Sequence, residues 1–338
     1  MKSDIKVSIL VPIYGVERFI ERCAVSLFEQ TYQNIEYVFV NDCTKDNSIS
    51  VLEEVIGRYP QRKSFVKIIN HEHNKGLAGA RNTAIDNATG DFVMHVDSDD
   101  YVTKDIVSKA VSKQKEKDAD IVVIDFIKAY PSFSQIVHYS SFPDVEEYCL
   151  TVLARRNSNS IWAKLIRRSL YVDNDVKCIE GCNQGEDFQV VPILLYYAKK
   201  IVNLKEPLYY YDCSNEGAYS NNFTICNHDQ NWESMNAVKS FFEHKGSAYR
   251  YAVDCGRVRQ IADDLIISAK SSKGVSNCYY DYACNQLNRI DQSCWKNVNL
   301  GKRLVLALSS NYNLMKSYAL SMRWIRHHIL MVKSKILK

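Results

Sequence analysis

An apolar run that ends in three carboxylates constrains the fold of this chain more than any other feature. Residues 92–96 form the kind of short, mostly apolar run that a buried parallel strand shows. Asp97, Asp99 and Asp100 follow at once, and their carboxylates repel one another and are costly to remove from water. Because ligands bind at the carboxyl ends of strands in open α/β sheets, we expect something cationic to meet this turn.

The acidic turn alone has two interpretations. Hard oxygen ligands on a short turn suit Mg²⁺ or Mn²⁺, which proteins hold through one or two carboxylates together with substrate phosphates. Alternatively, the turn is solvated and caps a helix that begins near Thr103. An Asp-x-Asp pattern is short and common, so the sequence upstream has to decide between the two.

Strands and helices alternate upstream of the turn. Apolar runs of strand length at 7–12, 35–40 and 65–69 alternate with segments of helical periodicity at 16–28 and 49–56. This alternation predicts βαβ units and a parallel sheet, in which the strand ends converge on one rim. The residues expected at that rim are Pro12 to Gly15, Asn41, Asp42, and Asp97 to Asp99.

The segment 74–82 supplies groups that suit a diphosphate. Gly76 and Gly79 lie where a loop becomes a helix, and the backbone N–H groups and dipole of a helix start can accept an anion. Arg81 adds a planar fork for phosphate oxygens. The sequence motifs of ATPases and dinucleotide-binding proteins are missing. A metal, a diphosphate cradle and a carboxylate that can pair with a base edge suggest a nucleoside-diphosphate ligand.

Four motifs in one order resemble the family 2 glycosyltransferases of the GT-A fold. They read VSILVPIY at 7–14, VNDCTKDNS at 40–48, NKGLAGARN at 74–82 and DSDD at 97–100. The resemblance is dense over the first hundred residues and thinner to about Ser220. It implies an α/β fold with a Rossmann-like mixed, mainly parallel sheet flanked by helices, and a helical C-terminal extension. It also implies transfer of a sugar, with inversion, from a nucleotide-diphosphate donor, usually a UDP-sugar.

The same resemblance implies roles on the nucleoside side of the donor. Pro12 and Tyr14 would form the wall against the nucleoside, and Asp42 would accept a hydrogen bond from the base edge. The alternative for Tyr14 is simple surface packing. For Asp42 the alternative is a helix N-cap, although Asp46 and Ser48 suit the cap of the next helix better.

On the phosphate side, the resemblance implies a metal-assisted site. Gly79 belongs to the predicted cradle, and Arg81 would approach the diphosphate or the ribose. Asp97 would reach the ribose or the metal, and Asp99 would coordinate the Mg²⁺ or Mn²⁺ that bridges both phosphates.

Paired carboxylates at the start of a later helix resemble the family's Glu-Asp motif. Inverting transfer needs a base on the acceptor hydroxyl, and the resemblance implies that Asp187 is this base, with Glu186 as its orienting or acceptor-binding neighbour. The alternative is that both residues only complement the helix N-terminus. Trp162 and Lys164 resemble the family's Trp-x-Lys segment. Trp162 is either a sugar platform or plain core, and Lys164 is interpreted as a phosphate or acceptor contact.

Three positions depart from the family pattern. Cys43 stands where glycine is usual, so that loop is expected to take another conformation, and Gly15 replaces a common asparagine. Asp212 stands where relatives tend to carry arginine, which removes a phosphate contact or leaves it to Lys164 or a later basic residue. The histidines without partner spacing are interpreted as structural, namely His71, His73 and His95.

The C-terminal part of the chain is interpreted as helical. We expect a nucleotide-sugar-binding and catalytic domain at 1–222, a helical acceptor-side or packing region at 223–300, and a basic amphipathic tail at 301–338. The net charge is +4, yet no acidic residue follows Asp291, so the rest of the chain is net acidic and nucleic-acid binding is not expected. The tail suits an anionic membrane surface or, alternatively, a docked helix or homodimer contact.

Together these patterns predict a metal-dependent inverting glycosyltransferase of surface polysaccharide synthesis, with a glycan or lipid-linked acceptor. Neither a targeting segment nor a stretch of transmembrane length is found, so we expect a cytoplasmic protein, peripheral on the inner membrane face. One alternative is a sugar-1-phosphate nucleotidyltransferase, which should carry a glycine-rich basic loop after the first strand, unlike residues 12–16. The other is a catalytically silent sugar- or partner-binding module, for which Asp212 leaves room.

Overall fold

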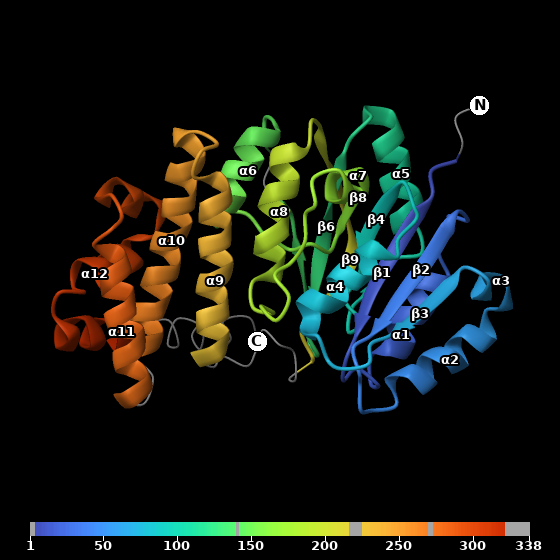
Figure 1. Ribbon diagram of the computed structural model, residues 1–338, viewed down its shortest axis with the longest axis horizontal. Coiled ribbons are helices and arrows are strands. Elements are labelled where there is room, and N and C mark those ends of the chain that lie inside the picture. Colours follow the sequence, from blue (N-terminus) through green and yellow to red (C-terminus); the bar gives the residue numbers. More distant parts are fainter. Residues whose placement is uncertain (1–3, 140–141, 216–224, 270–272, 322–338) are drawn as a thin grey trace. The chain divides into compact units, whose positions relative to one another are not determined.

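The computed structural model describes residues 4–139, 142–215, 225–269 and 273–321. It forms two compact units, Met1–Cys149 with Asn157–Ser240, and Leu150–Arg156 with Phe241–Lys338. All strands of the described chain belong to one sheet in the first unit (Figure 1). They are β1 (Val7–Ile13), β2 (Ile35–Asn41), β3 (Val66–Asn70), β4 (Phe92–His95), β5 (Tyr101–Val102), β6 (Ile121–Ala129), β7 (Ser134–Val137), β8 (Lys164–Arg167) and β9 (Ile201–Asp212).

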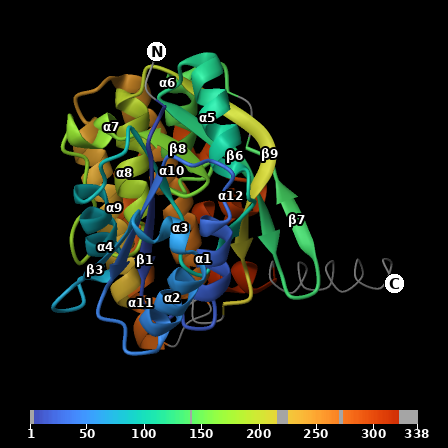
Figure 2. The same cartoon turned by 90° about the vertical axis from the view of Figure 1, so that its right-hand side faces the viewer.

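The sheet has the strand order β3-β2-β1-β4-β8-β6-β9-β5, with β7 paired to β6. Strands β1 to β4 are parallel to one another, as the apolar runs predict. The mixed character comes from β8, which lies antiparallel between β4 and β6, and from the antiparallel pairs β5–β9 and β6–β7. Figure 2 shows the β6–β7 hairpin extending beyond the other strands.

The helices between the first four strands lie on both faces of the sheet. They are α1 (Ile20–Phe28), α2 (Ser48–Arg58), α3 (Pro60–Lys63) and α4 (Gly76–Asp86). After β3 the chain crosses back over β2 and β1 to reach β4, and right-handed crossovers then place α4 on the face opposite to α1 and α2 (Figure 2). The reversal lies between β1 and β4, so a crevice for ligands is expected outside the carboxyl ends of these two strands.

The rest of the first unit brings later segments to that crevice. Its helices are α5 (Ile106–Lys117), the first part of α6 (Val145–Leu153), α7 (Ser169–Val172), α8 (Glu186–Tyr197) and most of α9 (Ile225–Phe242). A parallel bridge between His95 and Trp162 sets the segment before β8 beside the end of β4. The helix predicted near Thr103 begins three residues later, at Ile106, and the short strand β5 lies before it.

The second unit is helical in its described part, as predicted. It contains α10 (Ser247–Ser268), α11 (Lys273–Leu287), the 3₁₀ helix η2 (Gln292–Asn297) and α12 (Leu300–Ala307). Val258, Ile261 and Leu265 lie on one apolar side of α10 and are fully buried, because α11, η2 and α12 pack on this helix. Residues 322–338 of the predicted basic tail lie outside the described residues. The helices described include none with the length and apolar character that a membrane crossing requires.

Candidate active site

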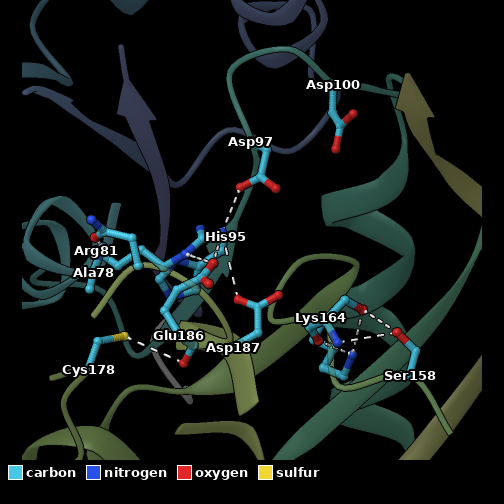
Figure 3. A network of polar contacts seen from close by, with 12 residues as sticks. Ala78, Arg81, His95, Asp97, Asp100, Ser158, Lys164, Cys178, Glu186 and Asp187 are labelled. Carbon is cyan, nitrogen blue, oxygen red and sulfur yellow. Dashed lines mark hydrogen bonds and ion pairs between the residues drawn. The ribbon is translucent and has the colours of Figure 1, made fainter. Parts of the chain in front are cut away.

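Arg81 joins the acidic turn to the paired carboxylates of α8. Its Nη2 lies 3.0 Å from Asp97 Oδ1, 3.3 Å from Glu186 Oε1 and 3.7 Å from Asp187 Oδ1 (Figure 3). The guanidinium is only 2% exposed, so these ion pairs are shielded from solvent. Three segments that are far apart in the sequence, α4, the end of β4 and the start of α8, therefore supply one cluster.

The Arg81 cluster, by which we mean Arg81, Asp97, Glu186 and Asp187, holds more negative than positive charge. Burial, with the charge of Asp187, raises the pKa of Glu186 to about 8, although Arg81 acts in the opposite direction. Burial also raises the pKa of Asp187, against the lowering effect of Arg81 and Lys164. One guanidinium cannot neutralise three carboxylates, so this cluster tends to retain a proton. A carboxyl group with a raised pKa is suited to proton transfer near neutral pH.

Asp99 lies beside the Arg81 cluster in a setting that suits a cation. Burial and the charge of Asp97 raise the pKa of the Asp99 carboxyl, which accepts a 2.8 Å hydrogen bond from Asn215 Nδ2. Among the described residues, no group of three or more acidic, histidine or cysteine side chains forms a complete metal cage. Two oxygen donors, Asp97 and Asp99, fit an Mg²⁺ or Mn²⁺ ion whose remaining ligands are substrate phosphates and water.

The third carboxylate of the turn is structural. Asp100 is fully buried and accepts hydrogen bonds from Tyr209 Oη at 2.7 Å and from the backbone N–H of Asp212 at 2.8 Å. Asp212 in turn pairs with Arg22, which also donates to the Asp99 carbonyl at 3.2 Å. No sequence pattern predicts these contacts, and the single signal was the aspartate at position 212, where relatives tend to carry arginine.

The start of α4 is already occupied by the chain's own side chains. Asp42 accepts hydrogen bonds from the backbone N–H groups of Lys75 at 2.7 Å and Gly76 at 2.8 Å, and Asn183 Oδ1 accepts one from Ala78 at 3.0 Å. Backbone N–H groups at this helix start therefore already bind the Asp42 carboxylate, and the phosphate cradle stays a prediction. Asp42 therefore acts as a helix cap, which was the alternative for this residue. It caps α4, however, and not α2, the helix that follows it in the sequence.

Neighbours hold Asp42 and Gly79 in place, and their donor-binding roles stay predictions. His71 Nδ1 lies 2.7 Å from Asp42 Oδ1, which leaves one of the roughly four lone pairs of the carboxylate for a base edge. Gly79 allows close packing, because an added Cβ would lie 2.6 Å from Lys75 Cβ. Cys43 has a left-handed φ of 57°, which is a conformation that glycine favours. The change of loop conformation expected from the replacement of glycine by Cys43 is therefore not seen.

The remaining predicted residues differ in exposure. Pro12 is buried in β1, whereas Tyr14 is 54% exposed and available to a ligand at the β1 end. Trp162 stacks on Tyr209 and Tyr211 with ring centroids 4.8 and 5.3 Å apart, which favours the core interpretation. Lys164 lies in the interior, and its contact with phosphate or acceptor stays a prediction.

The Lys164 ammonium is only 1% exposed and is held by neutral groups. It donates to the Ser160 carbonyl and lies 3.4 Å from Tyr139 Oη. A direct contact with phosphate or acceptor, as predicted, would require its cover to move. Its charge nevertheless acts on the Asp187 carboxyl, whose pKa it lowers against the effect of burial.

Comparisons with known proteins agree with the fold described above. The model of "Glycosyl transferase family 2" matches residues 8–175. An uncharacterized glycosyltransferase, EpsJ of Bacillus subtilis, is 32% identical over 212 residues, which are 61% of this chain and 60% of EpsJ. The glycosyltransferase GlyG of Streptococcus pneumoniae is 29% identical over 61% of this chain and 70% of its own length. The crystal structure of Staphylococcus aureus TarS residues 1–349 in complex with UDP-GlcNAc superposes with a TM-score of 0.76, at 20% identity, over 95% of this chain and 92% of that one.

Proposed function

Because this chain belongs to glycosyltransferase family 2 and has the GT-A fold, we propose that it moves a sugar from a UDP-sugar to a hydroxyl group of a glycan or lipid-linked acceptor, with inversion. The observation that carries the proposal is the Arg81 cluster, in which the strand-end carboxylate Asp97 and the candidate base Asp187 share one guanidinium. The UDP-GlcNAc bound by TarS motivates the choice of a uridine nucleotide.

The donor would lie across the carboxyl ends of β1 and β4. Tyr14, exposed at the end of β1, would pack against the nucleoside, and Asp97 and Asp99 would hold the Mg²⁺ or Mn²⁺ ion. A bound divalent ion would supply positive charge against the departing diphosphate. Arg81 would hold Asp97 in position for this task through its 3.0 Å ion pair.

Asp187 would act as the general base. The acceptor oxygen would attack the anomeric carbon, the bond from that carbon to the diphosphate would break, and the acceptor proton would pass to the Asp187 carboxylate. A raised pKa, caused first by burial, makes this carboxylate a stronger base than an exposed aspartate. Glu186, whose pKa is raised to about 8, would remain protonated at neutral pH and keep the cluster from carrying a third negative charge.

Donor binding and turnover test this function directly. We expect a UDP-sugar with Mn²⁺ to raise the melting temperature of the protein, because preferential binding to the folded state stabilises it. UDP release should follow when an acceptor saccharide is added, and chelation by EDTA should abolish it. The matched controls are GDP-sugars and the Asp99→Asn variant. A silent binding module would show no metal-dependent UDP release with any sugar nucleotide, and a nucleotidyltransferase would release pyrophosphate from UTP and a sugar phosphate.

The second unit would meet an anionic membrane on which the lipid-linked acceptor lies. Four leucines of its described part are at least 40% exposed, and no acidic residue follows Asp291, so apolar and basic groups are combined there. The exposed leucines are Leu300, Leu304, Leu314 and Leu320. Sedimentation with anionic liposomes should fall when Leu300 and Leu304 are both changed to glutamine. Equal sedimentation with neutral and anionic liposomes would instead favour a protein contact such as a homodimer.

A further inference from the structure

Three buried polar atoms around Arg81 accept or donate no hydrogen bond within the described chain. They are Arg81 Nη1, His95 Nδ1 and Asp187 Oδ1. Arg81 and His95 are almost completely buried, and the three residues, from α4, the end of β4 and the start of α8, lie near one another (Figure 3). Leaving one buried polar atom without a partner costs about 1–3 kcal/mol, so three such atoms in one cluster indicate a shared partner.

The His95 ring is fixed so that one nitrogen is engaged and the other is free. Its Nε2 lies 3.3 Å from Tyr171 Oη, and the two rings have centroids 6.1 Å apart. Its Nδ1 has no partner among the described residues and offers a single hydrogen bond, as donor or as acceptor, to its surroundings.

We propose that Arg81 Nη1, His95 Nδ1 and Asp187 Oδ1 bind one internal water molecule, and that through this water His95 positions Arg81 and the candidate base Asp187. The chemistry of the three atoms fits one water molecule. Arg81 Nη1 donates to the water oxygen, and the water donates one hydrogen to Asp187 Oδ1. His95 Nδ1 makes the third hydrogen bond to the water. Internal waters typically make about three such bonds to groups that lack other partners.

The bound water gives His95 a role that its position in a buried strand does not suggest. All three ion pairs of Arg81 use Nη2, so nothing else in the described chain restrains Nη1 by a hydrogen bond. A guanidinium held at both ends keeps Asp97 and Asp187 at a constant separation, which in-line transfer requires. The positioning role depends on the proposed function, whereas the water site does not.

Variants with asparagine or glutamine at position 95 distinguish the contributions of the two ring nitrogens of His95. The amide of His95→Asn reaches the place of Nδ1, and the amide of His95→Gln reaches the place of Nε2. We expect His95→Gln and His95→Phe to lower kcat by about tenfold and His95→Asn to stay within about twofold, with the donor KM nearly unchanged in all three. His95→Phe should still fold, because an aromatic ring of similar shape fills the same space, but its melting temperature should fall slightly, since the water and Tyr171 Oη each lose a partner.

Equal losses of kcat in His95→Asn and His95→Gln, or a wild-type kcat in His95→Phe, would overturn the positioning role. A high-resolution crystal structure of the unmodified protein tests the water itself: we expect density within hydrogen-bond distance of the three atoms, and clear density without it would overturn the site. If no sugar nucleotide reacts with the wild-type protein, the proposed function fails, and the electron density still decides the water site.

Discussion

The starts of α4 and α8 both lie beside buried carboxylates, but the carboxylates are used differently. At α4, Asp42 is bonded to two backbone N–H groups and to His71, so its charge is consumed in holding the helix. At α8, Glu186 and Asp187 share one guanidinium with Asp97. A carboxylate that is buried among several donors anchors structure, whereas carboxylates that are buried with too little positive charge stay reactive.

Asp187→Asn should have the largest effect on activity. Loss of the general base is expected to lower kcat by about 10³-fold. The free energy of unfolding at pH 7 should not fall, because the change removes a buried charge from a cluster with excess negative charge. Steady-state UDP release and urea unfolding measure both quantities. Glu180→Gln is the matched control, since this carboxylate is exposed and its ion pair within the described residues is with Lys75. A kcat for Asp187→Asn within tenfold of wild type would reassign the base.

Asp42→Asn should show the opposite pattern. One amide oxygen cannot replace a carboxylate that accepts three hydrogen bonds, and we expect the free energy of unfolding to fall by about 2 kcal/mol. The kcat of the fraction that remains folded should change by less than about tenfold. Urea unfolding followed by circular dichroism measures the loss. A variant of wild-type stability with a strongly raised donor KM would make Asp42 a base-recognition residue and would break the comparison between the two helix starts.

The sequence predicted the strand ends well because strand burial leaves a strong local pattern. The predicted ends of β1, β2 and β3 differ from the observed ones by one residue, and the acidic turn follows β4 directly, as expected. The internal partners of Lys164 and Asp42 could not be predicted in the same way. Whether a charged side chain meets solvent or an internal partner depends largely on segments distant in sequence, such as the backbone N–H groups of Lys75 and Gly76 beside Asp42, and no local pattern reports that.

Contacts between distant segments also explain what the sequence analysis missed around the site. Asp100 and Tyr209 are 109 positions apart, and Arg81 and Glu186 are 105 apart. His95 was interpreted as structural because spacing alone shows no partner, yet the strand brings its ring beside Tyr171 and Arg81. Motif order predicted which residue types gather at the rim, and the three-dimensional structure was needed to show how they are paired.

The pH dependence of stability sharpens the contrast at α8. The folded pKa of Glu186 is about 8 against an ordinary 4.5, so between these values the folded state binds more protons than the unfolded chain. Its contribution to stability is fully present below about pH 4.5 and is lost as the pH rises through about 8. Between pH 5 and pH 8, we expect the free energy of unfolding of Glu186→Gln, measured by urea unfolding, to rise relative to that of the wild type by about 1–2 kcal/mol. A constant difference across this range would mean that Glu186 is ionised throughout.

Asn183 gives the smallest predicted effect and tests whether the start of α4 is only structural. Asn183→Ala removes the acceptor of the Ala78 N–H, and we expect the free energy of unfolding to fall by about 1 kcal/mol, with kcat within about twofold. The Asn183 side chain also occupies the space beside Gly76, where a Cβ would lie 2.2 Å from its Nδ2. Gly76→Ala should therefore cost less stability in the Asn183→Ala background than in wild type, although the strain of a φ of 75° remains in both. If Asn183→Ala instead kept full stability and lost donor affinity, the N–H groups of α4 would contact the donor, and both helix starts would belong to the active site.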